Sequence, residues 1–326
     1  MKRKLISVVL SVFAMLLLMG AADNAGPAAT LLAEEESPVS QKAGLETEAR
    51  SPGKIPVAGS RKTDMPEDPE ATEDPPVEVT EDANLLIDGQ PAPLELNKVL
   101  QNGVTYLSLS VMTRQLVPDA QISWDGSAAF VVTDQVSLTA KVGELYVEVN
   151  GRYLYVPETV QLTQAGQVIV PLRVVAKAFG AEVDYDPATG VTTVTSGSGS
   201  IQSGDDFYDP DDLFWISRVI HRESGNQPMK GKMAVGNVVL NRVADPIFPD
   251  TVEGVLAQKN QFSSYASGAM AATKPSEASI IAAKLVMDGG VVEETRGAFF
   301  FDSGTNSWAA RNKQLIATIG GHHFYG

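Results

Sequence analysis

The sequence has no cysteine, only three histidines and few basic residues among its 326 positions. Without thiols, the chain cannot form disulfides, a cysteine-ligated zinc site, a lipid anchor on an N-terminal cysteine or a cysteine nucleophile. The 25 lysines and arginines are outnumbered by 40 aspartates and glutamates, which gives a net charge of −15. We therefore expect no nucleic-acid partner, because proteins that bind nucleic acids carry basic surfaces for the phosphate backbone.

The N-terminus has the features of a secretory signal peptide. Lys2–Lys4 form a charged start, Leu5–Met19 is an apolar run, and Gly20–Ala22 are small residues suited to cleavage. We predict a signal peptide over residues 1–22; the alternative is an uncleaved N-terminal anchor. No other run is apolar enough to span a bilayer, so we expect a secreted mature form without a membrane segment. A cysteine-free exported protein fits a bacterial envelope best.

Two segments have the composition of linkers. Residues 23–83 are rich in proline, acidic residues, alanine and threonine, and cannot bury enough apolar surface to offset chain entropy. We predict that this segment is disordered. Residues 197–207 begin with alternating glycine and serine, which predicts a flexible joint. The joint separates a domain over 84–196 from a second domain over 208–326, which is long enough for one modest core.

Residues 84–196 contain an internal repeat of short strands. Leu86–Gln90 is similar to Glu148–Arg152, and Gly103–Leu109 is similar to Gly166–Leu172. In both copies a short helix and two further strands follow. The pattern predicts a duplicated, β-rich α+β domain.

The second copy holds the residues that indicate a known domain. The run Val170–Arg173, followed by Ala176 and Phe179–Ala181, resembles the duplicated domain named after the N-terminal stalk of copper amine oxidases, common in exported proteins of Gram-positive bacteria. The resemblance implies a stalk that acts as a spacer or a wall-association module. Because residues 84–196 contain no histidine and no cysteine, we expect no copper site there.

Residues 209–225 have the pattern of one amphipathic helix that ends at an acid. Asp209 is suited to cap this helix, Pro210 to start it and Gly225 to end it. At roughly 100° per residue, Glu223 falls in the middle of the apolar face. The apolar residues of this face are Leu213, Trp215, Ile216, Val219 and Ile220.

Glu223 is a candidate catalytic acid because of that position. A carboxyl group among apolar side chains tends to keep its proton, since desolvation raises its pKa. An acid that is still protonated near neutral pH can act as the general acid in glycosidic-bond cleavage. The alternative is that Glu223 reaches solvent past Gly225, or pairs with Arg222 or Arg218.

The rest of the second domain predicts helices and a small β element. Residues 230–242 form a largely apolar and therefore buried helix, in which Asn237 and Asn241 need hydrogen-bond partners. The pattern also predicts helices near 250–257 and 275–289, and strands at 298–301 and 315–319. We therefore predict an α+β fold, mostly helical with a small β element.

Six motifs follow one another over nearly all of residues 208–326. They are Ser217–Gly225, Val235–Arg242, Phe248–Val255, Gln261–Ser263, Ala298–Asp302 and Thr318–His322. In order and spacing, these motifs resemble the cell-wall hydrolase family of the spore-cortex-lytic enzyme SleB. The resemblance implies a lysozyme-like fold and a role in sporulation or germination. It also implies an exported peptidoglycan-cleaving glycosidase, a lytic transglycosylase or muramidase, that cuts the MurNAc–GlcNAc bond with Glu223 as general acid and base.

Five further residues are candidates for holding a glycan strand, the expected partner. Polar side chains suit sugar hydroxyl and acetamido groups, and an aromatic ring suits a sugar face; the alternatives are loop solvation and structural hydrogen bonding. The candidates are Gln261, Ser263, Tyr265, Trp308 and His322. Glu253 and Asp302 are candidates for a second catalytic carboxylate, although a helix cap and a turn explain them. We predict no metal and no cofactor.

Two other functions stay open at this point. A metalloenzyme would need His221, His322, His323 and Glu223 as ligands. His221 and Glu223 are two residues apart on a helix and diverge by about 160°, so they cannot share a metal. A non-catalytic wall-binding protein is the second alternative; it would bind sacculi and release no soluble fragments.

Overall fold

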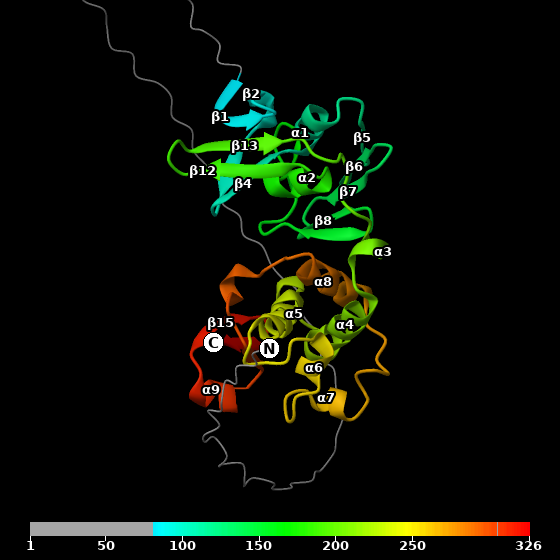
Figure 1. Cartoon of the computed structure of the whole chain (residues 1–326), viewed down its shortest axis with the longest axis vertical. Coiled ribbons are helices and arrows are strands. Elements are labelled where there is room, and N and C mark those ends of the chain that lie inside the picture. Colours follow the sequence, from blue (N-terminus) through cyan, green and yellow to red (C-terminus); the bar gives the residue numbers. More distant parts are fainter. Residues whose placement is uncertain (1–80, 305) are drawn as a thin grey trace, which may run out of the picture. The chain divides into compact units, whose positions relative to one another are not determined.

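The structure is a computed structural model that describes residues 81–304 and 306–326 (Figure 1). The predicted signal peptide over residues 1–22 lies outside the described residues, as does the predicted linker apart from residues 81–83. Those three residues belong to the first strand, β1, so regular structure begins slightly before the predicted start at residue 84. No helix in the described part of the chain combines the length and the apolar character that crossing a membrane requires.

The N-terminal region folds into three sheets around one hydrophobic core. The strand orders are β12–β13–β1–β2, β10–β11–β4–β3 and β5–β6–β7–β8–β9. The bounds are β1 Glu81–Ile87, β2 Gln90–Pro93, η1 Leu94–Leu96, β3 Val99–Gln101, β4 Val104–Ser108, α1 Leu109–Leu116, β5 Gln121–Trp124, β6 Ala128–Val132, β7 Ser137–Lys141, β8 Tyr146–Val149, β9 Arg152–Tyr155, β10 Gln161–Leu162, β11 Val168–Pro171, α2 Leu172–Ala178, β12 Glu182–Asp186 and β13 Val191–Thr195.

The two copies of the internal repeat share their sheets. The equivalent strands β4 and β11 pair antiparallel, with Leu107 opposite Val170, and each runs directly into a helix, α1 or α2. β1 of the first copy pairs in parallel with β13 of the second, while β6 and β8, one from each copy, flank β7. One core that includes Leu107, Val131, Val149 and Val170 therefore serves both copies.

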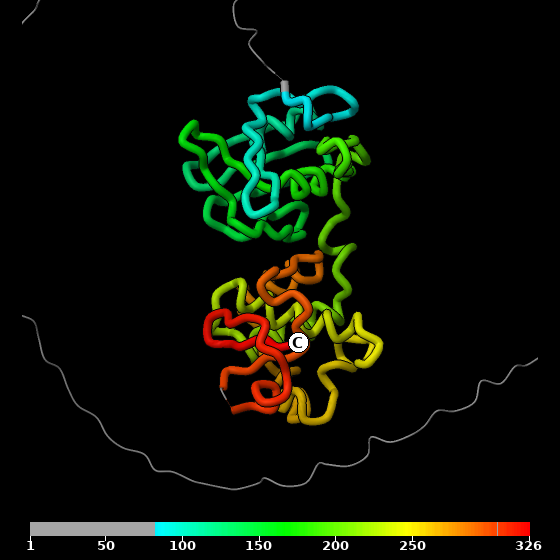
Figure 2. Tube along the Cα trace, turned by 90° about the vertical axis from the view of Figure 1, so that its left-hand side faces the viewer, coloured from blue at the N-terminus to red at the C-terminus, as the bar shows by residue number. Residues whose placement is uncertain are grey.

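The C-terminal region is mostly helical and has one small antiparallel sheet of order β14–β16–β15. The bounds are α3 Gly204–Phe207, α4 Pro210–Ser224, α5 Met229–Ala244, α6 Val252–Leu256, α7 Ser263–Ala266, α8 Glu277–Met287, η2 Glu293–Thr295, β14 Phe300–Asp302, α9 Trp308–Asn312, β15 Leu315–Ile319 and β16 His322–Tyr325. The last two strands pair as a hairpin, red in Figure 2. The predicted α+β class is confirmed.

The predicted joint over residues 197–207 contains a short helix, α3. The hydroxyl of Ser203 caps this helix by accepting a hydrogen bond from the N–H of Asp206 (3.3 Å). The glycine and serine composition alone did not predict this turn of helix, because the capping residue lies after the repetitive part of the segment.

Helix α5 is the centre of the C-terminal region, as the sequence predicted. Its residues Met233, Val235, Val238 and Val239 have no exposed surface, and α4 and α8 both pack against it. A Cβ atom on Gly236 would lie 2.9 Å from Val286 and 3.0 Å from Ile220. The small residue therefore allows three helices to meet closely.

Two asparagines of α5 fix the segment that leads into the small sheet. The Asn237 amide donates to the main-chain oxygen of Gly290 (2.9 Å) and accepts from the N–H of Val292 (3.0 Å). Asn241 donates to the oxygen of Ala298 (2.9 Å). The prediction that both amides need partners is confirmed, and these bonds join α5 to the residues that precede β14.

Candidate active site

Helix α4 forms for the reasons that the sequence indicated. The Asp209 carboxylate accepts hydrogen bonds from the N–H groups of Asp211 (3.0 Å) and Asp212 (2.9 Å), and Pro210 is the first helical residue. Ile216, Val219 and Ile220 are completely buried. Gly225 follows the last helical residue in a right-handed conformation with a φ of −55°, not in the left-handed form common after helices.

Glu223 lies in the last turn of α4, half-buried at the end of the apolar face. The hydroxyl of Ser264 donates a hydrogen bond to its Oε1 (3.2 Å). Burial raises the pKa of the Glu223 carboxyl, and this effect outweighs the opposing effects of the Ser264 hydrogen bond and the Arg222 charge. The carboxyl thus has the raised pKa that its position in the sequence predicted.

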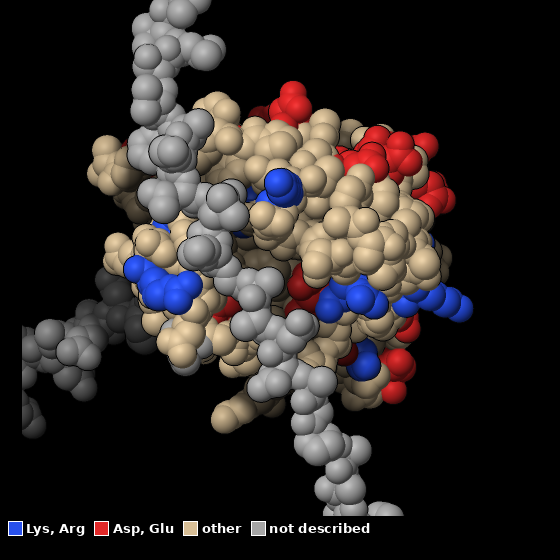
Figure 3. Space-filling view, turned by 90° about the horizontal axis from the view of Figure 1, so that it is seen from below, with Lys and Arg blue, Asp and Glu red and all other residues tan. Residues whose placement is uncertain are grey.

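A pocket of about 390 Å³ opens beside Glu223. Figure 3 shows acidic atoms recessed in a hollow of the surface, with lysine and arginine side chains around it. Two acids, one arginine, one histidine, four aromatic rings and small polar groups line the pocket. They are Glu223, Arg242, Asn260, Gln261, Phe262, Phe300, Phe301, Asp302, Ser303, Ser307, Trp308, Ala309 and His322.

His322 is a buried, neutral member of this lining. Desolvation lowers the pKa of its imidazole. The charge of Asp302 and a hydrogen bond with the main chain of Glu223 act in the opposite direction, but their effect is smaller. Its ring packs edge-on against Phe301 with 5.7 Å between the centroids. Nδ1 has no hydrogen-bond partner among the described residues.

Asp302 is the second acid of the pocket, and its carboxylate oxygens are already engaged. Oδ2 accepts from the hydroxyl of Ser307, while Oδ1 accepts from the N–H of Gly304 (3.2 Å) and the hydroxyl of Tyr325 (3.3 Å). The turn that the sequence predicted for this residue is present, and the turn also brings the carboxylate to the pocket. The groups that shift the pKa of Glu223 do not include Asp302.

The structure brings together four of the six residues that the sequence predicted as the catalytic acid and the glycan-binding residues. Glu223, Gln261, Trp308 and His322 line the same pocket. Trp308 is 56% exposed as a residue, and its ring centre lies 5.6 Å from that of Phe300, so part of this side chain is open to a ligand.

Ser263 and Tyr265 are not part of the lining. Ser263 is exposed at the first position of α7, and the buried Ser264 contacts Glu223 in its place. The Tyr265 hydroxyl donates to Glu253 (2.9 Å), and its ring lies 5.2 Å from Trp215. Both side chains therefore belong to the outer surface of α6 and α7.

Sequence reasoning missed Ser264 and Arg242. Arg242 comes four residues after Val238 and three after Val239, both buried, so it ends an apolar helix face as Glu223 does. That spacing was a signal that could have identified Arg242. Ser264 left no such signal, because α7 is only four residues long and has no periodicity.

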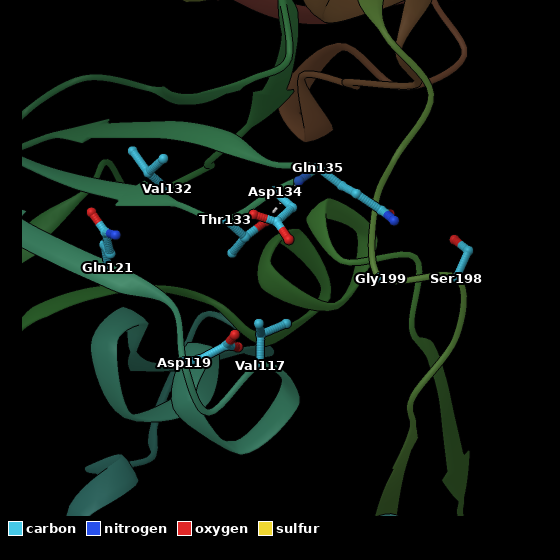
Figure 4. Close-up of a pocket in the computed structure, with 9 residues that line it drawn as sticks. All are labelled: Val117, Asp119, Gln121, Val132, Thr133, Asp134, Gln135, Ser198 and Gly199. Carbon is cyan, nitrogen blue, oxygen red and sulfur yellow. Dashed lines mark hydrogen bonds between the residues drawn. The ribbon is translucent and has the colours of Figure 1, made fainter.

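A second cavity, of about 360 Å³, lies in the N-terminal region (Figure 4). Its polar side chains are those of Asp119, Gln121, Thr133, Asp134, Gln135 and Ser198. None of its lining residues is one that the sequence singled out. Within residues 81–304 and 306–326, no group of three or more histidine, aspartate or glutamate side chains is arranged to hold a metal ion.

Two family models match the chain. Residues 226–325 match the Cell Wall Hydrolase family, and residues 86–194 match the copper amine oxidase N-terminal domain. Both resemblances stated from the sequence are thereby confirmed. The first match begins three residues after Glu223, so it gives no information about this residue. The second covers a segment without histidine or cysteine, which does not fit a copper site.

Curated relatives of the C-terminal region are spore cortex-lytic enzymes. The one from Bacillus cereus is 33% identical over 121 residues, which cover 36% of this chain and 45% of the relative. The one from Oceanobacillus iheyensis is 30% identical over 144 residues, which cover 40% of this chain and 50% of the relative. The chain thus spans about half the length of the curated relatives that it matches.

Two solved structures are also similar to the chain. The catalytic domain of the Bacillus cereus SleB protein is 28% identical, covers 36% of this chain and 92% of its own length, and has a TM-score of 0.33. The catalytic domain of the germination-specific lytic transglycosylase SleB from Bacillus anthracis is 28% identical. The match covers 39% of this chain and 100% of that structure, with a TM-score of 0.34. At these scores we base no argument on the two structures.

Proposed function

We propose that the C-terminal region, a SleB-like cell wall hydrolase domain that follows a copper amine oxidase N-terminal domain, cleaves peptidoglycan glycan strands with Glu223 as general acid and base. The observation that carries the proposal is the position of this acid. It is half-buried, its pKa is raised, and it borders a pocket of about 390 Å³ that has aromatic and polar walls.

In the first step, the neutral Glu223 carboxyl gives its proton to the oxygen that links MurNAc to GlcNAc. The bond between that oxygen and C1 of the muramic residue breaks, and C1 develops oxocarbenium character. GlcNAc leaves with the proton, and Glu223 becomes a carboxylate. The raised pKa suits this step because it keeps a larger fraction of the carboxyl protonated than an exposed glutamate would have at the same pH.

In the second step, the carboxylate takes the proton of the muramic C6 hydroxyl. The C6 oxygen attacks C1 and closes a 1,6-anhydro ring, which restores neutral Glu223 without consuming water. One acid is enough because the nucleophile belongs to the same sugar and is already positioned. Hydrolysis by a muramidase would instead need a second carboxylate to assist the reaction.

Asp302 is the pocket's candidate for such a second carboxylate. Its oxygens accept hydrogen bonds from Ser307, Gly304 and Tyr325, and these three bonds favour a structural role for the carboxylate. We therefore propose that the anhydro product prevails over the hydrolytic one.

The other pocket residues have separate roles in this proposal. Ser264 orients the carboxyl by donating to Oε1, which leaves Oε2 for the proton. Gln261 offers an amide for sugar hydroxyl and acetamido groups, and the exposed face of Trp308 stacks on a sugar ring. His322 packs beside Glu223 as a neutral group.

The setting of this activity is also a proposal. The predicted signal peptide supports a secreted protein associated with the wall of a Gram-positive-type envelope, and the predicted linkers and stalk support a catalytic domain held at a distance. The similarity to spore cortex-lytic enzymes supports a role in sporulation or germination.

The test is the release of soluble fragments from purified sacculi by the mature chain. We expect release by the wild type, loss of at least about a hundredfold with Glu223→Gln, and no change with Ser263→Ala, a matched control outside the pocket. Sacculus binding without fragment release by the wild type would support the non-catalytic wall-binding function instead.

A further inference from the structure

Arg242 is a buried cation in the wall of the pocket that contains Glu223. It lies near the end of α5 and is 3% exposed. Its Nε donates to the main-chain oxygen of Phe299 (2.8 Å), while Nη1 has no hydrogen-bond partner among the described residues. A buried donor of this kind is destabilising unless a further group completes its hydrogen bonds.

Three phenylalanine rings surround the guanidinium group. Its Cζ lies 5.3 Å from the ring centre of Phe248, 5.8 Å from that of Phe262 and 5.1 Å from that of Phe300. Phe262 and Phe300 also line the pocket. The rings attract a cation but do not replace the strong hydrogen bonds that a carboxylate accepts from arginine.

No carboxylate within the described residues forms an ion pair with Arg242. Burial lowers its pKa to about 10, so the group is still a cation at neutral pH. The two acids of the pocket have other partners, since Glu223 accepts from Ser264 and Asp302 accepts from Ser307. The site therefore contains a desolvated positive charge that takes part in no ion pair within the described residues.

A second cation lies at the same end of the pocket. Lys313 Nζ is 4.9 Å from the ring centre of Phe300 and 5.9 Å from that of Trp308. Lys313 is exposed and is not among the residues that line the pocket, so its charge acts from outside, while Arg242 is part of the lining. The charge on this wall favours an anionic group on the ligand.

We propose that Arg242, with Phe262 and Phe300 beside it, forms a carboxylate-binding subsite that takes the acidic group on the O3 substituent of a muramic residue. Of the two sugars that alternate in a glycan strand, only the muramic residue carries a carboxylic acid substituent, and GlcNAc is uncharged. A guanidinium binds a carboxylate with paired N–H bonds, which adds geometric specificity. The subsite determines which sugar lies beside Glu223.

The substrate class in this inference rests on the proposed function. Two sources can supply the carboxylate: the lactyl group itself, where no peptide is attached, or the end of a short peptide stem. Both offer the same chemistry to Arg242, and they differ in their reach from the sugar ring.

Three glycan substrates test the subsite with the wild-type mature chain. The first has free lactyl carboxylates, the second has these groups converted to methylamides, and in the third they carry a single alanine. We expect kcat/KM to be at least about tenfold lower for the methylamide than for the better of the two carboxylates. The better carboxylate identifies the source. Equal kcat/KM on all three substrates would overturn the proposal without any variant.

Variants separate binding from folding. Arg242→Gln is expected to lower kcat/KM more on the better carboxylate substrate than on the methylamide, so that the preference for the carboxylate disappears. Arg242→Lys retains part of the preference, and Arg311→Gln, an exposed control on α9, retains all of it. If Arg242→Gln lowers both activities by the same factor, Arg242 has only a structural role and the subsite is rejected.

A binding measurement makes the result independent of cleavage. Calorimetric Kd values for the same glycans with the Glu223→Gln chain should show the same preference for a carboxylate. If the chain prefers carboxylate glycans in binding but the wild type cleaves none, the proposed function is rejected and the subsite is supported. If the wild type cleaves the glycans and shows no preference for a carboxylate, the proposed function is supported and the subsite is rejected.

Discussion

Replacing Ser264 by alanine changes one hydrogen bond at the candidate acid and little else. The Ser264 hydroxyl donates to Oε1 of Glu223 over 3.2 Å, and this bond holds the pKa of the carboxyl below the value that burial alone would give. Alanine removes the donor and leaves the methylene group in place. The carboxylate loses a stabilising partner while the neutral acid loses less, so the pKa of Glu223 must rise.

The size of the shift follows from the energy of one such bond. A hydrogen bond contributes about 1 kcal/mol net, which corresponds to about 0.7 pKa unit. A general acid must be protonated, so the alkaline limb of the kcat/KM profile reports its pKa in the free enzyme. We expect Ser264→Ala to move this limb upward by about 0.7 pH unit.

The assay is a pH–rate profile for cleavage of soluble glycan strands by the wild type, Ser264→Ala and Ser263→Ala. Ser263 is the matched control because it is adjacent, exposed and outside the pocket. An unchanged or lowered alkaline limb in Ser264→Ala would refute the assignment of this limb to Glu223. An equal shift in the Ser263 control would refute the role of the Ser264 bond.

Three further predictions concern the stability and the walls of the site. First, Glu223→Gln should stabilise the fold at neutral pH. Because folding raises the pKa of Glu223, the folded state binds more protons, and wild-type stability falls as pH rises from about 4.3 through the folded-state pKa. The difference in unfolding free energy between the variant and the wild type, measured by chemical denaturation, should therefore grow as pH rises over that range. The growth is about 1.4 kcal/mol per unit by which folding raises the pKa, and no growth is expected at lower pH. A difference that does not change with pH would contradict this prediction. Second, Trp308→Ala should raise KM about three- to tenfold with a smaller change in kcat, because the exposed part of the side chain binds a sugar while the ring also contacts Phe300 and Lys313; steady-state kinetics check this, and an unchanged KM would exclude stacking. Third, Asn237→Ala should cost about 2–5 kcal/mol, because two buried main-chain groups, of Gly290 and Val292, lose their partner. Thermal unfolding checks the third, with the exposed Asn306→Ala as control, and equal Tm values would refute it.

The parts of the site that follow local rules could be predicted from the sequence. Asp209, Pro210 and the apolar spacing determine where α4 starts and which face it buries, so the half-buried position of Glu223 followed from one segment. The partners needed by Asn237 and Asn241 followed in the same way from the burial of α5. Each of these inferences needs only the periodicity of a helix.

The parts that depend on how segments meet could not be predicted. Ser263 and Ser264 are neighbours with the same side chain. Only the way α7 lies against α4 decides which of the two hydroxyls reaches Glu223. Asp302 forms the expected turn, but its place in the pocket depends on β14. In the N-terminal region the repeat was visible, whereas the sharing of sheets between its copies arises from long-range strand pairing.

Mass spectrometry of the fragments released from sacculi measures the proposed chemistry most directly. If Glu223 acts alone as acid and base, the wild type releases fragments that end in 1,6-anhydro-muramic acid, lighter by one water than the hydrolytic product, and Glu223→Gln releases none. Fragments that end in reducing muramic acid, or the same anhydro fragments from the variant at the wild-type rate, would contradict the account.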